Sequence, residues 1–164
     1  LTTDPLPDAP MPAGLEVRPA TEEHIRPIWD AFNEAFSESW GFVRGTEDTF
    51  QRWISNPNFD PSLWKVAWDG DEVAGFAQCR YRMGIGWVGT LGVRRPWRQR
   101  GLGMALLQHA FGEFHKRDQL IIGLGVDAQN PTGATRLYER AGMHVASEFV
   151  IYEKEYRPGR EPEE

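Results

Sequence analysis

Apolar residues recur at helical spacing in several segments of the chain. After Thr21 they return every three or four positions as far as Phe36, which predicts a helix with Thr21 as its N-cap. The same spacing after Thr46 predicts a second helix over residues 47–55. Further along the chain, this pattern predicts helices over residues 102–117 and 132–141.

Strand-like alternation of apolar and polar residues separates these helices. It predicts strands over residues 15–18, 63–68, 72–82 and 86–93, of which the last three form a meander. Another strand is expected over residues 120–126, and a final pair within residues 143–156. The order predicts an α/β (α+β) fold, in which helices cover both faces of a mixed, mostly antiparallel central sheet.

A glycine turn lies between the strand expected to end at Val93 and the third predicted helix. Such a turn leaves free backbone N–H groups at the positive end of a helix dipole, where an anion is stabilised. Glycines let the main chain approach a ligand closely, and arginines add charged donors. The alternative is an ordinary chain reversal. The residues expected to hold a phosphate group are Arg98, Gln99, Arg100, Gly101, Leu102, Gly103 and Met104.

A second motif follows the strand predicted over residues 120–126. It consists of Asn130 and then a helix that carries Leu137 and Tyr138 and closes on Gly142. The first motif has Arg98, Gly101 and Gly103 at the spacing arginine, two residues, glycine, one residue, glycine. The two motifs together resemble those of the GNAT superfamily of acyl-CoA-dependent N-acetyltransferases. Met143 stands where that family has an aromatic residue.

The resemblance implies that acetyl-CoA is the co-substrate and that the glycine turn holds its pyrophosphate. In this family the two central strands, here those ending near Val93 and Val126, splay apart and the pantetheine arm lies in the gap. The thioester would then lie beside the backbone of Leu91, Gly92 and Val93, where a main-chain N–H would polarise the carbonyl. The side chains of these three residues are equally well explained as core.

The resemblance also assigns roles around the second motif. Tyr138 would donate a proton to the departing thiolate, whereas a core residue with its hydroxyl at the rim is the alternative. Asn130 would contact the pantetheine arm, with helix capping as the alternative. Arg136, one turn into the helix, would reach the cofactor phosphates or remain in solvent.

The part of the site that would bind and deprotonate the acceptor amine is less well defined by the sequence. Members of this family often carry a carboxylate base on the strand before the glycine turn, yet residues 85–93 contain no Asp or Glu. Trp87 stands where mycothiol-synthase-like repeats would have the acid. His24 and Asp127 are other candidates for the base. The residues expected to contact the acceptor, or alternatively to be surface and core groups, are Glu34, Glu38, Trp40 and Phe42.

Composition limits the partners and the location of the protein. A chain of 164 residues supports one ordinary domain, and its net charge of −6 does not favour a nucleic-acid partner. No apolar run approaches the roughly 20 residues of a membrane span. The single cysteine, Cys79, excludes an internal disulfide, which predicts a cytoplasmic protein. His109 and His115 share one helix without a second type of ligand, so no metal site is predicted.

These observations predict a proline-rich linker or arm over residues 1–14, one acetyltransferase domain over residues 15–157 and a polar tail over residues 158–164. The expected activity is acetyl transfer from acetyl-CoA to a primary amine of a small molecule or peptide, by direct attack in a ternary complex. The alternative is a non-catalytic acyl-CoA-binding repeat. With its proline-rich lead, the chain resembles the second repeat of a tandem acetyltransferase, for which the resemblance implies a second repeat as partner; an ordinary single-domain member of the family is the alternative, and a homodimer is the other expected partner.

Overall fold

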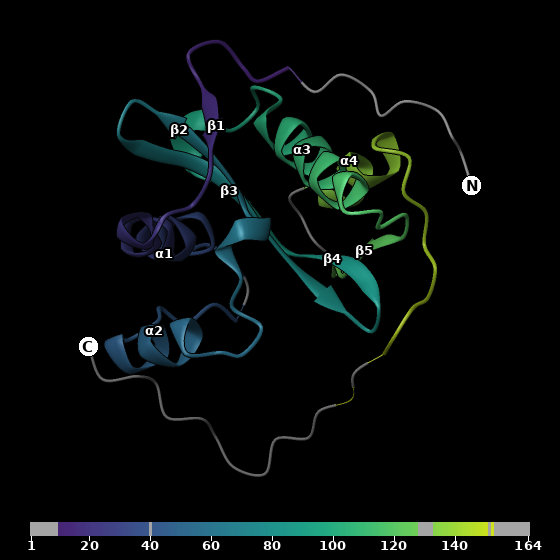
Figure 1. The fold of residues 1–164 in the computed structure, drawn as a ribbon, viewed down its shortest axis with the longest axis horizontal. Coiled ribbons are helices and arrows are strands. Elements are labelled where there is room, and N and C mark those ends of the chain that lie inside the picture. Colours follow the sequence, from purple (N-terminus) through teal and green to yellow (C-terminus); the bar gives the residue numbers. More distant parts are fainter. Residues whose placement is uncertain (1–9, 40, 128–132, 151, 153–164) are drawn as a thin grey trace.

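A single five-stranded sheet organises the chain in the computed structural model, which describes residues 10–39, 41–127, 133–150 and 152 (Figure 1). The strands lie side by side in the order in which they follow in sequence. All neighbouring pairs are antiparallel except β4 and β5, which are parallel. The strands are β1 (Glu16–Arg18), β2 (Lys65–Asp69), β3 (Glu72–Arg82), β4 (Ile85–Val93) and β5 (Ile122–Leu124).

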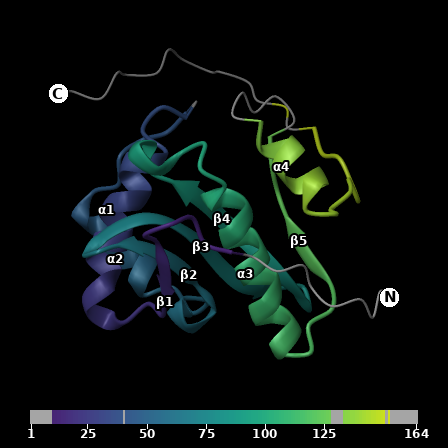
Figure 2. The same ribbon diagram turned by 90° about the horizontal axis from the view of Figure 1, so that it is seen from above.

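Helices cover both faces of this sheet, as the sequence predicted (Figure 2). One face carries α1 (Ile25–Ala35) and α2 (Glu47–Ile54), and the other carries α3 (Leu102–Lys116). A last helix, α4 (Ala134–Arg140), follows β5. Short 3-10 turns, η1 (Glu22–His24), η2 (Pro61–Leu63) and η3 (Arg95–Trp97), connect these elements.

The core fills both interfaces between helices and sheet. On the α3 face, fully buried leucines and Phe114 pack on the strands, and Gly86 makes room for the Phe114 ring. On the α1 face, aromatic rings of α1 and α2, together with Trp64 after η2, pack as a continuous cluster onto Phe76 of β3. The α1 stripe that periodicity identified, including Ile28 and Trp29, is buried here.

Strand β4 changes its pairing partway along its length. A β-bulge leaves Gly89 without a partner on β3, because Gln78 pairs with Thr90 while Cys79 pairs with Val88. On the other side, β5 pairs with β4 only as far as Val88. The far half of β4 is therefore unpaired on the side of β5, as the predicted splay requires.

The final pair of strands was predicted wrongly in the part of it that the structure describes. Residues 143–150 and 152 contain no strand, and their apolar side chains are exposed, among them Val145, Phe149 and Tyr152. Alternation of apolar and polar residues predicts a strand only if a partner buries one face, and no described element does so here. The remaining residues of that segment, 151 and 153–156, lie outside the described part.

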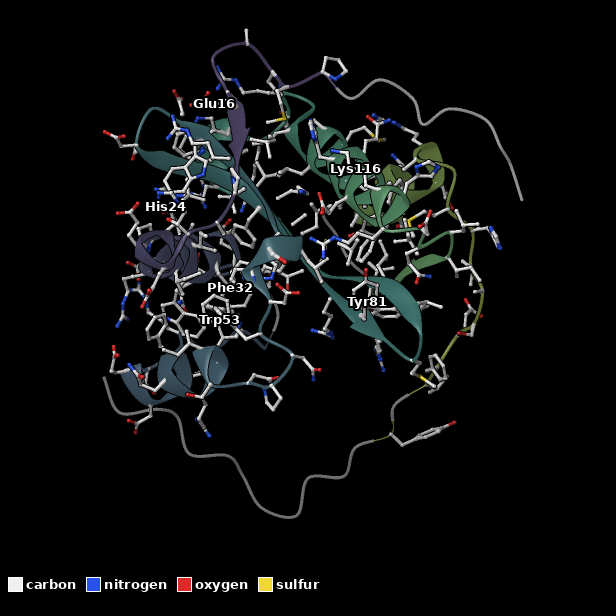
Figure 3. All side chains as sticks on the ribbon, in the orientation of Figure 1. Glu16, His24, Phe32, Trp53, Tyr81 and Lys116 are labelled. Carbon is white, nitrogen blue, oxygen red and sulfur yellow. The ribbon has the colours of Figure 1, made fainter. Side chains whose placement is uncertain are left out.

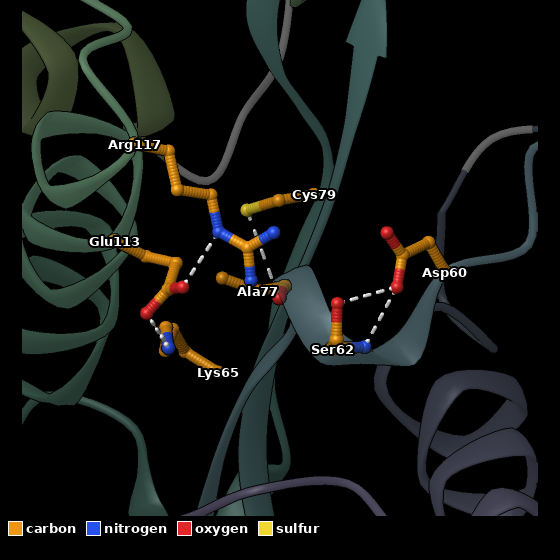
Figure 4. Close-up of polar contacts among 7 residues, drawn as sticks. All are labelled: Asp60, Ser62, Lys65, Ala77, Cys79, Glu113 and Arg117. Carbon is orange, nitrogen blue, oxygen red and sulfur yellow. Dashed lines mark hydrogen bonds and ion pairs between the residues drawn. The ribbon is translucent and has the colours of Figure 1, made fainter.

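Glu113 of α3 pairs with Lys65 of β2 and with Arg117 at the end of its own helix, and the first of these contacts joins the helix to the sheet (Figure 4). Its carboxylate accepts hydrogen bonds from Lys65 Nζ at 2.7 Å and from Arg117 Nε at 2.8 Å. The bond from Lys65, opposed by burial and aided by Arg117, lowers the pKa of Glu113 below its ordinary value. The charged carboxylate is therefore stabilised in the folded protein.

Substituting Glu113→Gln is expected to lower the free energy of unfolding by about 1–2 kcal/mol at neutral pH, because a partly buried network of two cations loses its negative charge. A carboxyl whose pKa is lowered on folding stabilises the protein above its unfolded pKa and loses this contribution as the pH falls through the folded value. Urea unfolding should therefore show the gap between wild type and variant closing below about pH 4.5. Glu148→Gln, at an exposed position, is the control; a gap independent of pH would contradict the prediction.

Candidate active site

The glycine turn is built as the sequence predicted. Gln99 and Gly101 both have positive φ, 60° and 82°, and Gly101 is the N-cap of α3. A positive φ is readily adopted by glycine, so Gly101 suits the point at which the chain enters the helix. The first N–H groups of α3, at Leu102, Gly103 and Met104, have no acceptor within the helix and lie at its positive end.

Arginine side chains link this turn to the end of α1 through hydrogen bonds and ion pairs. Arg98 donates to the carbonyl oxygens of Val93 and Ala35, each at 3.0 Å. Glu38 pairs with both Arg95 and Arg98. These contacts fix the position of the turn relative to the end of β4, where the thioester is expected. Arg100 is exposed and has no ion pair within the described residues, which leaves its guanidinium available to a phosphate.

Glu34 and Glu38 lie against these arginines. Glu34 Oε2 accepts a hydrogen bond from Arg94 Nε at 2.8 Å, and Arg94 also donates to the carbonyl oxygen of Val73 at 2.9 Å. Both carboxylates, expected beside the acceptor, thus neutralise the charge of the turn and of the residues before it. Their contact with an acceptor stays a prediction.

Helix α4, which carries Tyr138, packs beside the glycine turn through Leu137. The helix starts after Gly133, whose φ is 74°, and a Cβ on Gly103 would lie 3.5 Å from Leu137 Cδ2. Gly142 N–H donates to the Glu139 carbonyl and Met143 N–H to that of Tyr138, which closes the helix in a Schellman motif. Burial raises the pKa of the Tyr138 hydroxyl, so the phenol stays protonated at neutral pH.

The backbone expected at the thioester lies on the splayed half of β4. A Cβ on Gly92 would come within 2.6 Å of Phe76 Cζ and 3.1 Å of Phe36 Cε2, so glycine is required by packing alone. Leu91 and Val93 are half-buried against the core. With no β5 residue paired beyond Val88, this edge of β4 has backbone groups to offer a ligand.

A groove of about 590 Å³ opens next to this stretch of β4, on the face that carries α1 and α2. We call it the α2–β4 groove. One side is an aromatic wall formed by Trp53, Phe59 and Trp64, whose rings pack with centroids 5.2 Å apart. The floor consists of polar side chains from β3 and β4, namely Gln78, Arg80 and Thr90.

Two features of this floor are unusual. The Nε2 atom of Gln78 is buried and has no hydrogen-bond partner within the described part of the chain. The Arg80 side chain crosses the bulge, since a Cβ on Gly89 would lie 2.9 Å from Arg80 Nη1. Glycine at the bulge therefore leaves the space that the guanidinium occupies.

Trp87 continues the same face of β4. Its indole lies over β5, where a Cβ on Gly123 would come within 2.8 Å of it, and the Arg82 guanidinium stacks on it at 4.6 Å. The position expected to hold a carboxylate base in mycothiol-synthase-like repeats is thus an aromatic platform for a cation. No Asp or Glu of the described ranges lines the groove.

The remaining predicted site residues are placed as follows. The centroid of the Phe42 ring lies 6.3 Å from that of Phe32, a residue of α1. Figure 3 labels Phe32 and Trp53 on this side of the sheet. His24 packs on the Trp68 ring at 4.6 Å and does not line the groove. Arg136 is exposed on α4. Trp40 and Asn130 lie outside the described residues.

Sequence reasoning missed the residues of the groove floor. In the strand predicted over residues 72–82, the apolar pattern gives way to polar side chains at every second position, at Gln78, Arg80 and Arg82. These residues share the face on which Phe76 meets α1. That change of pattern within one strand was the available signal.

Comparison with known proteins shows the family and the fold of the chain. A family described as the acetyltransferase (GNAT) family matches residues 25–143. The chain belongs to this family. A GCN5-related N-acetyltransferase from Sphaerobacter thermophilus superposes with a TM-score of 0.74 at 38% identity, over 87% of this chain and 45% of that one. An aminoglycoside N-acetyltransferase in complex with CoA has the same fold, with a TM-score of 0.65 at 13% identity over 85% of this chain and 94% of that one.

Among relatives of known name, the mycothiol acetyltransferase of Clavibacter michiganensis is 34% identical over 149 residues. The match covers 90% of this GNAT chain and 48% of the relative. A mycothiol acetyltransferase of Kineococcus radiotolerans is 33% identical and is matched over 46% of its length. The GNAT chain thus spans about half the length of these relatives.

Two further properties of this GNAT chain bear on its chemistry. In the described ranges, no three His, Cys, Asp or Glu side chains are grouped so that they could hold a metal ion. None of the described helices is long and apolar enough to cross a bilayer.

Proposed function

We propose that this GNAT domain transfers an acetyl group from acetyl-CoA to a primary amine of a small molecule or peptide, by direct attack in a ternary complex. The observation that carries the proposal is the meeting of two sites at one strand. The α2–β4 groove borders β4 at Gly89 and Thr90, and the splayed backbone with the glycine turn follows directly after them. An acceptor in the groove would therefore reach a thioester beside residues 91–93.

In the proposed reaction, the acceptor nitrogen forms a bond with the thioester carbonyl carbon and later loses a proton to solvent. A backbone N–H of residues 91–93 stabilises the negative charge on the carbonyl oxygen. When the carbon–sulfur bond breaks, its electron pair stays on sulfur, and the Tyr138 phenol supplies the proton. The raised pKa of this half-buried tyrosine supports the role, because the acid must be protonated before the step.

Direct attack is supported over a covalent intermediate on the enzyme by the state of Cys79. Burial raises the pKa of the Cys79 thiol to about 12, and its Sγ lies 3.9 Å from the Ala77 carbonyl oxygen. The thiolate, which is the nucleophilic form, is therefore scarce at neutral pH.

The test is release of free thiol from acetyl-CoA across a panel of primary amines, with binding of CoA measured separately by calorimetry. We expect micromolar to millimolar KM values for at least one amine, and a product mass that increases by one acetyl group. CoA binding without turnover on any amine would overturn the proposal and favour a non-catalytic acyl-CoA-binding repeat, which the lack of a carboxylate in the groove would then explain.

A further inference from the structure

We propose that the α2–β4 groove selects amine acceptors whose molecules also carry an anionic group, a carboxylate or a phosphate, and that Arg80 binds this group at the bulge of β4. The inference rests on the proposed function, because it names the acceptor class of the same site. It follows from the juxtaposition of Arg80, Gln78 and Arg82 on one face of β3, opposite the aromatic wall.

The first observation is the unneutralised charge of Arg80. The arginines that precede and enter the glycine turn, such as Arg94 and Arg98, are paired with carboxylates of α1 and its end. Arg80 has no carboxylate partner within the described ranges, and its guanidinium, on an exposed side chain, lies across Gly89. A planar guanidinium in a groove without a counter-ion matches the geometry of a carboxylate or phosphate.

The second observation is the unpartnered amide of Gln78. Its Nε2 can donate two hydrogen bonds, yet it is buried in the floor with no acceptor among the described residues. A buried donor without a partner costs about 1–3 kcal/mol, which an acceptor atom of a ligand offsets once the amide turns toward the groove. Gln78 and Arg80 lie two residues apart on β3 and face the same side, so one anionic group with several oxygens fits both donors.

The third observation is the sign of the charge around the groove. Arg82, stacked on Trp87, adds a second guanidinium to the same face, and no acidic side chain of the described ranges lines the groove. Nearby positive charge disfavours the ammonium form of an amine and so lowers its pKa. The arginines of the groove therefore also favour the neutral, nucleophilic form of the amine. This effect matters because no carboxylate of the described residues lines the groove to act as the base.

The test compares acceptors that differ only in charge at the end remote from the amine. Suitable probes are 4-aminobutanoate, 3-aminopropyl phosphate and 4-aminobutanamide, each assayed for kcat/KM with saturating acetyl-CoA. Wild type is expected to prefer at least one anionic amine over the neutral amide by about 10-fold or more, since a charged hydrogen bond is worth more than a neutral one. A larger preference for the carboxylate or for the phosphate assigns the anion.

The variants Arg80→Gln and Arg80→Glu separate charge recognition from general damage. Arg80→Gln should reduce the ratio of anionic to neutral kcat/KM to about 2 or less, and Arg80→Glu should reverse it in favour of the neutral amide. Arg52→Gln is the matched control: this exposed arginine on α2 donates to the Asp48 carbonyl and does not line the groove, so the ratio should stay that of wild type.

Equal kcat/KM for anionic and neutral amines in wild type would overturn the inference, as would a loss of the same size for both in Arg80→Gln. Turnover of amines without a charge preference leaves the proposed function intact, whereas no turnover on any amine rejects that function. In the second case, calorimetric titration of the CoA-bound protein with the same three probes still decides the charge preference. Equal affinity for all three would then reject the anion site.

Discussion

Replacing Tyr138 with phenylalanine is expected to lower kcat by about 100- to 1,000-fold and to leave KM for acetyl-CoA nearly unchanged, because general acid catalysis contributes about 10²- to 10⁴-fold. The substitution removes only the hydroxyl of a half-buried ring that packs against the core. Without a proton donor, the thiolate must leave as an anion. Thiol release measured against pH in wild type and variant checks this result.

Two controls distinguish an acid from a packing residue at this position. Tyr152→Phe, at a position that is 92% exposed, should leave kcat at the wild-type value. Acetyl thioesters of more acidic thiols need less help from an acid, so the loss caused by Tyr138→Phe should shrink with them. A loss that is constant over all thioesters, accompanied by a lower free energy of unfolding, would assign Tyr138 to packing instead.

Gly92→Ala is expected to lower the free energy of unfolding by about 2–3 kcal/mol, the range found when a well-packed core is overfilled. Its new methyl group would lie 2.6 Å from Phe76 Cζ, and Phe76 is fully buried between β3 and α1, with no space to withdraw. Chemical denaturation with urea measures the difference. The same variant is a poor probe of the thioester site, because that role belongs to the backbone.

Gly112→Ala provides the matched comparison for this prediction. Gly112 lies in the interior of α3, and a Cβ there would meet nothing within 4 Å. Alanine in a helix is favoured over glycine by about 0.8–1 kcal/mol, so this variant should be more stable than wild type. If both substitutions changed the free energy of unfolding alike, close packing at Gly92 would not be the cause.

The periodicity of apolar residues was sufficient to predict the bounds of the helices and strands that bury one face in the core. The strand predicted over residues 72–82 has those bounds as β3, and the helix predicted over residues 102–117 is α3, one residue shorter. Strand β5 is shorter than predicted because it pairs with β4 at only three positions. Exposed apolar residues such as Phe149 misled the prediction, since alternation carries no information about whether a partner strand is present.

The sequence predicted the expected acetyl-CoA site better than the α2–β4 groove. The expected acetyl-CoA site consists of contiguous motifs, so the turn at Gly101 and the helix that bears Tyr138 were recognised from their residues. The groove combines residues of α2, of the segment between α2 and β2, and of the β3–β4 pair, and the place of Arg80 depends on a one-residue bulge at Gly89. Neither the register of the β3–β4 pair nor the packing of α2 against the sheet can be predicted from local sequence patterns.

The β3–β4 hairpin is closed by Met83 and Gly84, both with positive φ, as in the tight two-residue turns that set strand register locally. The floor of the groove is thus fixed by the hairpin, while the aromatic wall comes from α2 and the segment that leads to β2. Changes in the wall can therefore reshape the space above Arg80 without shifting the strand that leads to the glycine turn. If the groove holds the acceptor as proposed, the choice of acceptor is separable in evolution from the use of the donor, and substitutions in residues 53–64 are one route by which specificity can diverge.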